Sequence, residues 1–399
     1  MGLNETPSGE RITIGFFGRC NVGKSSVVNA VTGQDLAVVS QVSGTTTDPV
    51  SKAMEILPLG PVMIIDTPGF DDNGELGELR IEKTKKILRR TDIAVLVIDE
   101  TQGMQPLDEY LVNLFKEKNI RYIIAHNKCD KLAALPANTL NDVYVSALTG
   151  AGIDCLKNKL GQFAAKNDER RLIGDLLHPG QLVVLVTPID EAAPKGRLIL
   201  PQQQTLRDIL DADCRAVVIK EDAVKDIFAD LAVVPAMVVT DSQVFEQVAR
   251  DVPAQVPLTS FSILMAHYKG FLKAAVEGVK HIEKLHDGDR ILISEGCTHH
   301  RQCGDIGTVK IPGWLKKHTE KELEIVPCSG GDFPQDLSAY AMVIHCGGCM
   351  LSGREVEFRM KLAAEQNVPF TNYGTVIAYM KGILPRALQI FSDDNVTLM

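Results

Sequence analysis

The chain has 399 residues, of which 45% are apolar and 23% are charged, and its formal net charge is −9. These values are typical of a folded protein with two or three domains, each large enough to bury its own core. They exclude a broad basic surface for nucleic acid, and no apolar run reaches the roughly 18–20 residues of a membrane span. Because the N-terminal residues also lack a signal-peptide pattern, we expect a cytoplasmic protein without membrane or nucleic-acid partners.

The first chemical motif is Gly18-Arg19-Cys20-Asn21-Val22-Gly23-Lys24-Ser25, which matches the phosphate-binding loop G-x-x-x-x-G-K-S/T. An apolar strand precedes it and a helix beginning at Ser26 follows it, which is the order that such a loop requires. Backbone N–H groups at the helix N-terminus hold phosphate oxygens, Lys24 is expected to reach the outer phosphates, and Ser25 to bind magnesium. The residues expected to contact nucleotide here are Asn21, Val22, Gly23, Lys24, Ser25 and Ser26.

Two further segments predict the magnesium and γ-phosphate contacts of a guanine-nucleotide switch. The polar, Thr-rich segment Val42–Pro49 occupies the position of a first switch, and Thr46 is its expected magnesium ligand. A strand then ends at Asp66 in the pattern Asp-x-x-Gly, in which the aspartate holds magnesium and the N–H of Gly69 meets the γ-phosphate. Lys24, Thr46 and Gly69 are therefore the expected catalytic residues.

Guanine recognition is predicted at the end of a later buried strand. Asp130, in the pattern N-K-x-D, can accept two hydrogen bonds from guanine N1 and N2, a donor pair that adenine lacks. Asn127 and Lys128 are expected to brace the base and the phosphate loop, and Ser146 with Ala147 to contact guanine O6 through the backbone. The order of these motifs predicts a GTPase.

This domain resembles the TrmE–Era group of translation-factor-related GTPases. The resemblance places Asn21 where potassium-activated members carry an asparagine, which implies a potassium ion between the phosphates. Phe70 stands where Ras-like proteins carry a water-orienting glutamine, so we expect slow turnover that rises with potassium. His126, beside the guanine motif, is expected to be a packed residue at a strand end rather than a catalyst.

Residues 171–265 are predicted to form a small parallel sheet without catalytic motifs. The expected strands are Gln181–Val186, Arg215–Ile219 and Ala236–Thr240, and the expected helices are Gln203–Leu210 and Ser242–Arg250. Such a module is expected to hold subunits together. An exposed edge strand invites pairing across a two-fold axis, so we expect a homodimer.

Residues 266–399 carry cysteines and histidines directly after two predicted strands. Cys297 and His299 follow one strand, and His345, Cys346 and Cys349 follow another. In a parallel sheet, both groups lie at the same carboxyl edge. Three thiolates suit a [4Fe-4S] cluster with one exchangeable position, and by their number they suit a zinc site with three cysteines and one histidine equally well.

A TrmE–Era-like GTPase joined to C-x-H and H-C-x-x-C resembles the maturation GTPases of [FeFe]-hydrogenase along essentially the whole chain. The resemblance implies a [4Fe-4S] cluster on Cys297, Cys346 and Cys349, with His299 and His345 as labile ligands or supports. It implies a scaffold that carries a diiron precursor. Its partners would be two radical-SAM maturases and apo-[FeFe]-hydrogenase. Asp305 is a remote alternative for the fourth ligand position.

The sequence thus predicts an α/β protein with a P-loop GTPase domain over residues 1–170, a connecting or dimerisation domain over 171–265 and an iron–sulfur domain over 266–399. The last two domains are expected to have mainly parallel sheets. GTP and Mg²⁺ are the expected ligands of the first domain, with K⁺ as a further ion. Two alternatives stay open: an RNA-acting GTPase of tRNA modification or ribosome assembly, and a zinc-stabilised regulatory GTPase.

Overall fold

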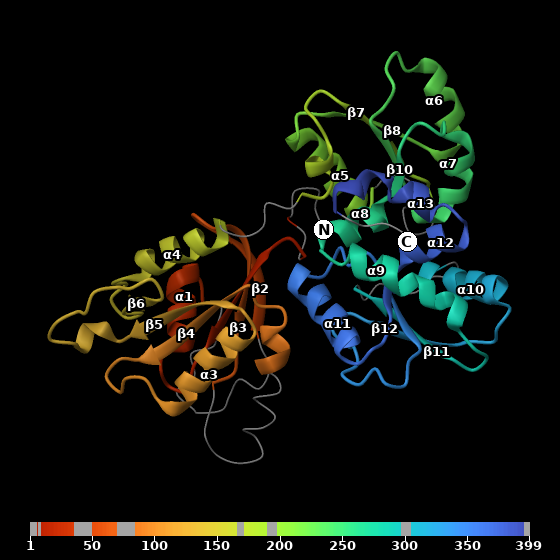
Figure 1. Cartoon of the computed structure of the whole chain (residues 1–399). Coiled ribbons are helices and arrows are strands. Elements are labelled where there is room, and N and C mark those ends of the chain that lie inside the picture. Colours follow the sequence, from red (N-terminus) through yellow and green to blue (C-terminus); the bar gives the residue numbers. More distant parts are fainter. Residues whose placement is uncertain are drawn as a thin grey trace. The chain divides into compact units, whose positions relative to one another are not determined.

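The computed structural model describes residues 6, 9–35, 50–69, 84–165, 171–189, 198–296 and 305–394 (Figure 1). The chain divides into two compact units, residues 1–168 and 169–399. Among the residues that the structure describes, none of the helices has the length and apolar character needed to cross a bilayer. Thr46, Cys297 and His299 lie outside the described residues.

The first unit is an α/β layer structure around a six-stranded sheet of order β2-β3-β1-β4-β5-β6, in which only the β2–β3 pair is antiparallel. Its strands are β1 Ile12–Phe17, β2 Val50–Ile56, β3 Gly60–Asp66, β4 Ile93–Asp99, β5 Arg121–Asn127 and β6 Asp142–Tyr144, and its labelled helices are α1 Lys24–Thr32, α3 Pro106–Glu117 and α4 Ile153–Ala165. Phe16 packs into the core under α1 and α4, and Phe17 into the core under α3. Both faces of the sheet are therefore covered, which explains why its central strands are continuous apolar runs.

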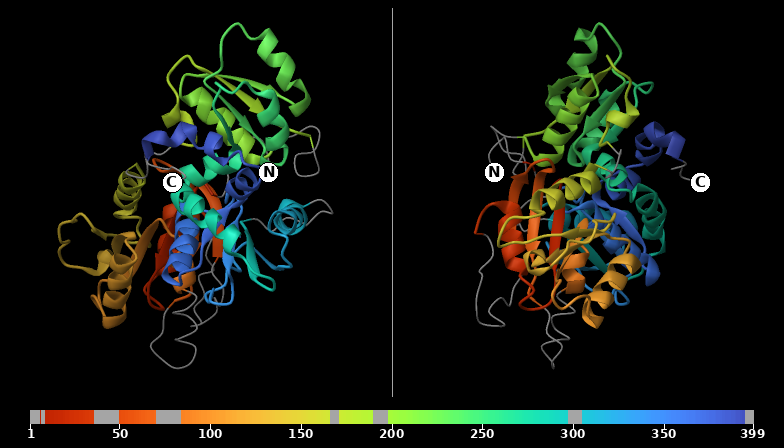
Figure 2. Two further views of the ribbon diagram at one scale, coloured as in Figure 1. Left: turned by 45° about the vertical axis from the view of Figure 1, so that its right-hand side comes forward. Right: turned by 90° about the vertical axis from the view of Figure 1, so that its left-hand side faces the viewer.

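The second unit contains two four-stranded sheets, shown in two further views in Figure 2, and every strand pair in them is parallel. The first sheet has the order β10-β9-β7-β8 and the second β12-β11-β13-β14. The strands are β7 Leu182–Val186, β8 Arg215–Ile219, β9 Met237–Thr240, β10 Leu258–Ser260, β11 Arg290–Glu295, β12 Glu324–Ser329, β13 Met342–His345 and β14 Phe370–Asn372. The helices are α5 Leu200–Asp211, α6 Val224–Asp230, α7 Phe245–Asp251, α8 Phe261–Tyr268, α9 Leu272–Val279, α10 Ile311–Thr319, α11 Gly353–Glu365, α12 Tyr373–Met380 and α13 Leu384–Ala387.

The two sheets of the second unit have the same topology. When each half is numbered by its own strands, both orders read 4-3-1-2. The fourth strand of each half runs directly into a helix, α8 or α12, whose N-terminus is capped by Ser260 or Asn372. Around these helices residues 256–270 and 368–382 align without a gap. Val256, Pro257, Thr259, Ala266, Lys269 and Gly270 recur as Val368, Pro369, Thr371, Ala378, Lys381 and Gly382. We conclude that the unit is an internal structural repeat.

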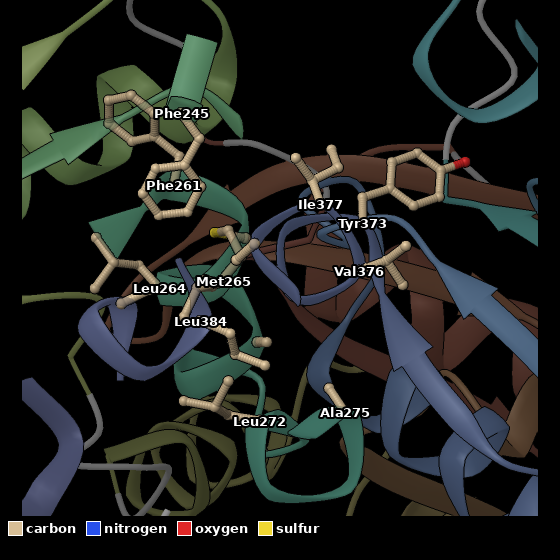
Figure 3. Close-up of a cluster of buried hydrophobic side chains, with 14 of the residues drawn as sticks. Phe245, Phe261, Leu264, Met265, Leu272, Ala275, Tyr373, Val376, Ile377 and Leu384 are labelled. Carbon is tan, nitrogen blue, oxygen red and sulfur yellow. The ribbon is translucent and has the colours of Figure 1, made fainter. Parts of the chain in front are cut away.

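One hydrophobic core is shared by both halves. Its centre holds Phe261, Leu264 and Met265 of α8 and the equivalent residues Tyr373, Val376 and Ile377 of α12 (Figure 3). The boundary that we predicted after residue 265 falls inside α8 and divides two sheets but not two cores. The three-domain division stays a prediction.

Removing a side chain from this core is expected to destabilise both halves together. Leu264 is fully buried, so Leu264→Ala is expected to lower the free energy of unfolding by about 2–5 kcal/mol. Urea unfolding followed by circular dichroism gives this value, while fluorescence of Trp314 in α10 reports on the other half of the unit.

Leu210→Ala is the control, because Leu210 lies in the same unit but is 53% exposed. It is expected to change the free energy of unfolding by no more than about 0.5 kcal/mol. A Trp314 transition that stays unchanged in Leu264→Ala would contradict the shared core.

Candidate functional site

The loop between β1 and α1 is held in a conformation that two glycines permit. A Cβ atom on Gly18 would lie 2.4 Å from the Val97 carbonyl oxygen, and one on Gly23 would lie 2.3 Å from Asn127 Nδ2. Gly23 also has a φ of 86° and caps α1, while Ser26 lies in the first turn of this helix. The backbone of the predicted phosphate loop therefore passes directly over the ends of β4 and β5.

The predicted phosphate and magnesium residues meet at Asp66, at the end of β3. The buried ammonium of Lys24 forms an ion pair with Asp66 Oδ1, and Ser25 Oγ donates to Asp66 Oδ2 at 3.0 Å. Gly69 lies against the same loop, because a Cβ atom there would be 2.7 Å from Cys20 Sγ. The structure thus brings together four of the five residues predicted for phosphate, magnesium and catalysis, and Thr46 lies outside the described residues.

The predicted guanine residues brace the phosphate loop from the end of β5. Asn127 Nδ2 donates to the Val22 carbonyl at 2.9 Å, and its Oδ1 accepts from the Ala147 N–H at 3.1 Å. Lys128 Nζ contacts Asp99 Oδ2 at 2.5 Å and the Asn21 carbonyl at 3.2 Å. The side chain of Ser146 is buried, and its Oγ accepts a hydrogen bond from the Thr149 N–H at 3.2 Å. Asp130 is exposed, as a carboxylate that is to meet a base must be.

Asp99 is a residue that the sequence analysis passed over. Burial alone would raise the pKa of its carboxyl, but hydrogen bonds from Lys128 and Thr101 hold that pKa below its ordinary value. A charged Asp99 can therefore anchor Lys128 at the end of β5. Its position at the end of an apolar strand was the only available signal.

His126 bridges two neighbouring strands rather than only packing at a strand end. Its Nδ1 lies 2.6 Å from Glu100 Oε2 and its Nε2 lies 3.1 Å from Asp142 Oδ1. The ring stacks on Tyr144 with centroids 4.4 Å apart. These contacts join β5 to β6 and to the end of β4 just below the guanine residues.

The strands β11 and β13 are adjacent and parallel and end at the same edge, as the sequence predicts. Cys346 Sγ accepts hydrogen bonds from the N–H groups of Gly296 at 3.0 Å and Gly348 at 3.3 Å. A Cβ atom on Gly296 would lie 2.9 Å from Leu351 Cγ, and Gly348 has a φ of 69°. Burial and the neighbouring Cys349 raise the pKa of the Cys346 thiol to about 12, so the sulfur is a thiol unless a cation or further donors stabilise the thiolate.

Two predicted ligands of this edge, Cys297 and His299, lie outside the described residues. Within the described part of the chain, no group of three or more His, Cys, Asp or Glu side chains is placed to hold a metal ion. Asp305 caps the turn that follows it, since its Oδ2 accepts from Thr308 N at 2.7 Å and from Thr308 Oγ1 at 2.8 Å.

His345 is fully buried and both of its ring nitrogens have protein partners. Nδ1 donates to the Cys346 carbonyl oxygen at 2.6 Å, and Nε2 accepts from Arg359 Nη1 at 3.3 Å. Burial and the Arg359 charge lower the pKa of His345 to about 3, so the ring is neutral. In this conformation the ring supports the strand end and does not point a free nitrogen to the cysteine edge.

Arg359 of α11 organises the ends of three strands below the cysteines, and the sequence analysis did not find it. Its fully buried guanidinium donates to Ser294 Oγ at 3.1 Å, to the Gly330 carbonyl at 2.5 Å and to His345. It forms an ion pair with Glu355 at 2.9 Å and lies over the Phe333 ring. The i,i+4 spacing of Glu355 and Arg359 did not indicate a buried pair in the sequence, because Glu357 and Lys361 have the same spacing on the exposed face of α11.

Three family models match the chain. A 50S ribosome-binding GTPase model matches residues 13–128, a hydrogen maturase F dimerization domain matches residues 172–270, and a hydrogen maturase F tetramerization domain matches residues 273–390. The chain is 33% identical over 156 residues to the tRNA modification GTPase MnmE of Thiobacillus denitrificans, covering 39% of this chain and 34% of that protein. It is 33% identical over 192 residues to GTPase Der of Wolinella succinogenes, covering 44% of this chain and 40% of that protein.

Two solved structures are similar to part of the chain. Era of Aquifex aeolicus, bound to GDP and AlF4−, has a TM-score of 0.35 and 22% identity over 52% of this chain and 92% of that one. A probable GTP-binding protein engB has a TM-score of 0.32 and 25% identity over 39% of this chain and all of that one.

The fold and the GTPase match define a P-loop enzyme that hydrolyses GTP, and this class implies Mg²⁺ as the companion ion. The two matches that follow it are specific to one group and together span most of the second unit. The chain belongs to the hydrogen maturase F family (HydF), the GTPases of hydrogenase maturation. The names of these domains also support an oligomeric protein.

Replacing Arg359 alone is expected to destabilise the second unit strongly. Arg359→Met leaves the Glu355 carboxylate buried without its partner, which typically costs about 3–5 kcal/mol of unfolding free energy. Chemical denaturation measures this loss. The matched control is Lys361→Met, which breaks an exposed pair of the same spacing and is expected to cost about 0.3–0.5 kcal/mol. Equal losses in both variants would show that Arg359 is not the central anchor.

Proposed function

We propose that this protein is a GTP-switched carrier that binds a [4Fe-4S] cluster at the cysteine edge and delivers a diiron precursor to apo-[FeFe]-hydrogenase. The observation that supports it most is the hydrogen bond from Gly296 N–H to Cys346 Sγ. Cys297 follows Gly296 directly in the sequence, and we therefore propose that it joins Cys346 and Cys349 at this edge. Membership of a hydrogenase-maturation family supports the proposed role in delivering a precursor to hydrogenase.

The residues at this edge fit an iron–sulfur cluster by their chemistry. Backbone N–H groups that point at a cysteine sulfur stabilise the thiolate form that iron requires. Gly296 and Gly348 let the chain turn tightly beside Cys346, since a Cβ atom on them would lie 2.9 Å from Leu351 Cγ and 3.1 Å from Val356 Cγ2 respectively. Cys297, Cys346 and Cys349 would hold the cluster, His345 would support the strand end, and His299 remains a proposed labile ligand. A cluster held by three thiolates supplies one exchangeable coordination position.

In the first unit, Lys24 and Gly69 are proposed to contact the outer phosphates, with Thr46 as the switch ligand. Ser25, Asp66 and Thr46 are proposed to hold magnesium, directly or through water. Lys24 is then proposed to turn from Asp66 toward the phosphates, because a magnesium ion beside Asp66 would repel the ammonium. Asp130 is proposed to read guanine while Asn127, Lys128, Ser146 and Ala147 fix the loop around it.

The partners of the second unit are proposed from its exposed edge strand, β8, and from family membership. β8 is an edge strand of its sheet, and Val218 on it is 41% exposed. We propose that β8 pairs with a second copy in a homodimer. The two radical-SAM maturases and apo-[FeFe]-hydrogenase are the proposed partners for loading and delivery, in the cytoplasm. We retain the division into domains 1–170, 171–265 and 266–399 as part of this proposal.

An RNA-acting GTPase is a weaker alternative. It is supported by the name of the tRNA modification relative, but the chain spans only 34–40% of the length of MnmE and Der relatives such as these. The hydrogen maturase F domains occupy the remainder of this chain instead. RNA that co-purifies and dissociates steeply with salt would favour the alternative.

Removing one thiol is expected to abolish the cluster but not GTP hydrolysis. Cys346→Ser, reconstituted anaerobically with iron and sulfide, is expected to lose the iron–sulfur absorption and EPR signals because a hydroxyl is a poor iron ligand. It should then fail to activate apo-hydrogenase.

Lys24→Ala is the complementary control, expected to keep the cluster and lose most GTP hydrolysis. A colourless wild-type protein that binds zinc instead of iron would contradict the cluster proposal and leave the GTPase assignment intact.

Potassium is expected to raise the rate of GTP hydrolysis above the rate in sodium. The proposed site uses Asn21, whose backbone carbonyl lies 3.2 Å from Lys128 Nζ and whose φ is 65°. A cation supplied there replaces the arginine finger of other GTPases, which is worth on the order of 10³–10⁵ in rate. Steady-state hydrolysis at equal ionic strength in KCl and NaCl measures the effect, with Asn21→Ala as the variant that should lose it. Equal rates in the two salts would remove the potassium proposal.

A further inference from the structure

The two halves of the second unit share the register of their strands as well as the strand order. The first half can therefore be compared with the second, residue by residue, at the positions next to the cysteine edge. In the first half, Val186 pairs with Ile219 and Thr240, and Thr240 pairs with Ser260. In the second half, Ser294 pairs with Cys328 and His345, and His345 pairs with Asn372. The equivalent rows are therefore Ile219, Val186, Thr240, Ser260 and Cys328, Ser294, His345, Asn372.

The two rows differ in chemistry at the same backbone positions. In the first half, Val186 and Ile219 are apolar and the neighbouring Thr240 is small. In the second half, Ser294 and His345 are buried and both accept hydrogen bonds from Arg359. The side chain of Arg359 is 1% exposed and that of its partner Glu355 is 9% exposed. The second half thus buries an ion pair and a histidine where the first half buries none.

The first half shows that this fold does not need such a network. Burying an ion pair gains little stability over a well-packed apolar substitute and often costs some. We propose that Arg359, with Ser294 and His345, is a positioning device for the cysteine edge, and that it is not required for folding.

The contacts of Arg359 account for this role. It holds β11 through Ser294, the loop after β12 through Gly330, and the end of β13 through His345. His345 then donates to the Cys346 carbonyl, and the Cys346 N–H donates to the Ser294 carbonyl at 2.9 Å. Cys346 begins the C-x-x-C turn, and Cys297 lies three residues after Ser294. One guanidinium therefore fixes the strand ends from which both cysteine groups start.

The test removes the network without leaving a lone buried charge. The double variant Arg359→Met/Glu355→Gln is expected to fold, with a thermal midpoint close to that of the wild type. Lys361→Met/Glu357→Gln, which removes the exposed pair of the same helix, is the matched control. His345→Thr, the residue found at this position in the first half, is the second variant and interrupts the network at one point.

The first measurement is made on the cluster-free protein and does not depend on the proposed function. Alkylation by iodoacetamide is followed residue by residue with mass spectrometry, with Cys155 of the first unit as the internal reference. Loss of the anchor is expected to accelerate alkylation of the half-buried Cys346 and Cys349 by about tenfold or more, because the turn that partly shields them opens more often. The control should keep the wild-type rates.

The second measurement asks whether the edge serves a cluster, and it rests on the proposed function. After anaerobic reconstitution, the double variant is expected to differ from wild type in EPR line shape and midpoint potential. A folded double variant with wild-type alkylation rates would overturn the positioning role. A wild-type protein that takes up no iron would overturn the proposed function, while the alkylation result would still decide the role of Arg359.

Discussion

The hydrogen bond from the Gly296 N–H to Cys346 Sγ is the contact on which the cysteine edge depends. It joins residues that are 50 positions apart in the sequence at a distance of 3.0 Å. It exists because β11 and β13 are neighbouring parallel strands, whose carboxyl ends meet at one edge. The same geometry operates in the first unit, where β1, β3 and β5 bring the phosphate loop, Asp66 and Asn127 together. Parallel sheets therefore create both candidate sites from segments that are distant in the chain.

The internal repeat shows how one backbone can serve two tasks. Both halves use the same strand order, the same capped helix after the fourth strand and equivalent core residues on α8 and α12. Among the residues that the structure describes, cysteines at the carboxyl edge and a buried guanidinium below them are found in the second half and not in the first. The row of the first half, Ile219, Val186, Thr240 and Ser260, supports the same kind of sheet without a buried guanidinium among the described residues. Packing alone therefore does not explain Arg359 and its partners in the second half. The features that both halves share are those that folding requires, and we assign the features found in the second half to the cysteine edge.

The sequence predicted the strands well because both units bury their central strands on two faces, which gives continuous apolar runs. The expected strand Gln181–Val186, for example, is found as β7 Leu182–Val186. The sequence also predicted that the strands before the two cysteine groups end at the same edge, since that follows from parallel order alone. The helix Ser242–Arg250 was predicted as one element, but a tighter turn over Ser242–Val244 precedes α7 Phe245–Asp251.

Other features had no local signal. The shared core depends on contacts between residues about 110 positions apart, such as Phe261 and Tyr373, and the fifteen-residue match around α8 and α12 was not recognised as a repeat until the two sheets were seen. Arg359 could not be separated from an ordinary helix-surface arginine, because an i,i+4 pair with glutamate is common on exposed faces. Its role follows from what surrounds it, and only the folded chain shows that all of its partners are buried. His126 was expected to pack at a strand end, but its bridging contacts were not predicted, since its two carboxylate partners come from other parts of the chain.

We propose that the ion pair between Lys24 and Asp66 takes part in the switch of the first unit. Both side chains are less than a tenth exposed, so separating them leaves each charge in need of a new partner. In the proposed site, the phosphates of GTP would supply a partner for Lys24, and magnesium would supply one for Asp66. Phosphate alone would leave the Asp66 carboxylate uncompensated, and magnesium alone would repel the ammonium. We therefore expect nucleotide and metal to bind cooperatively at this site.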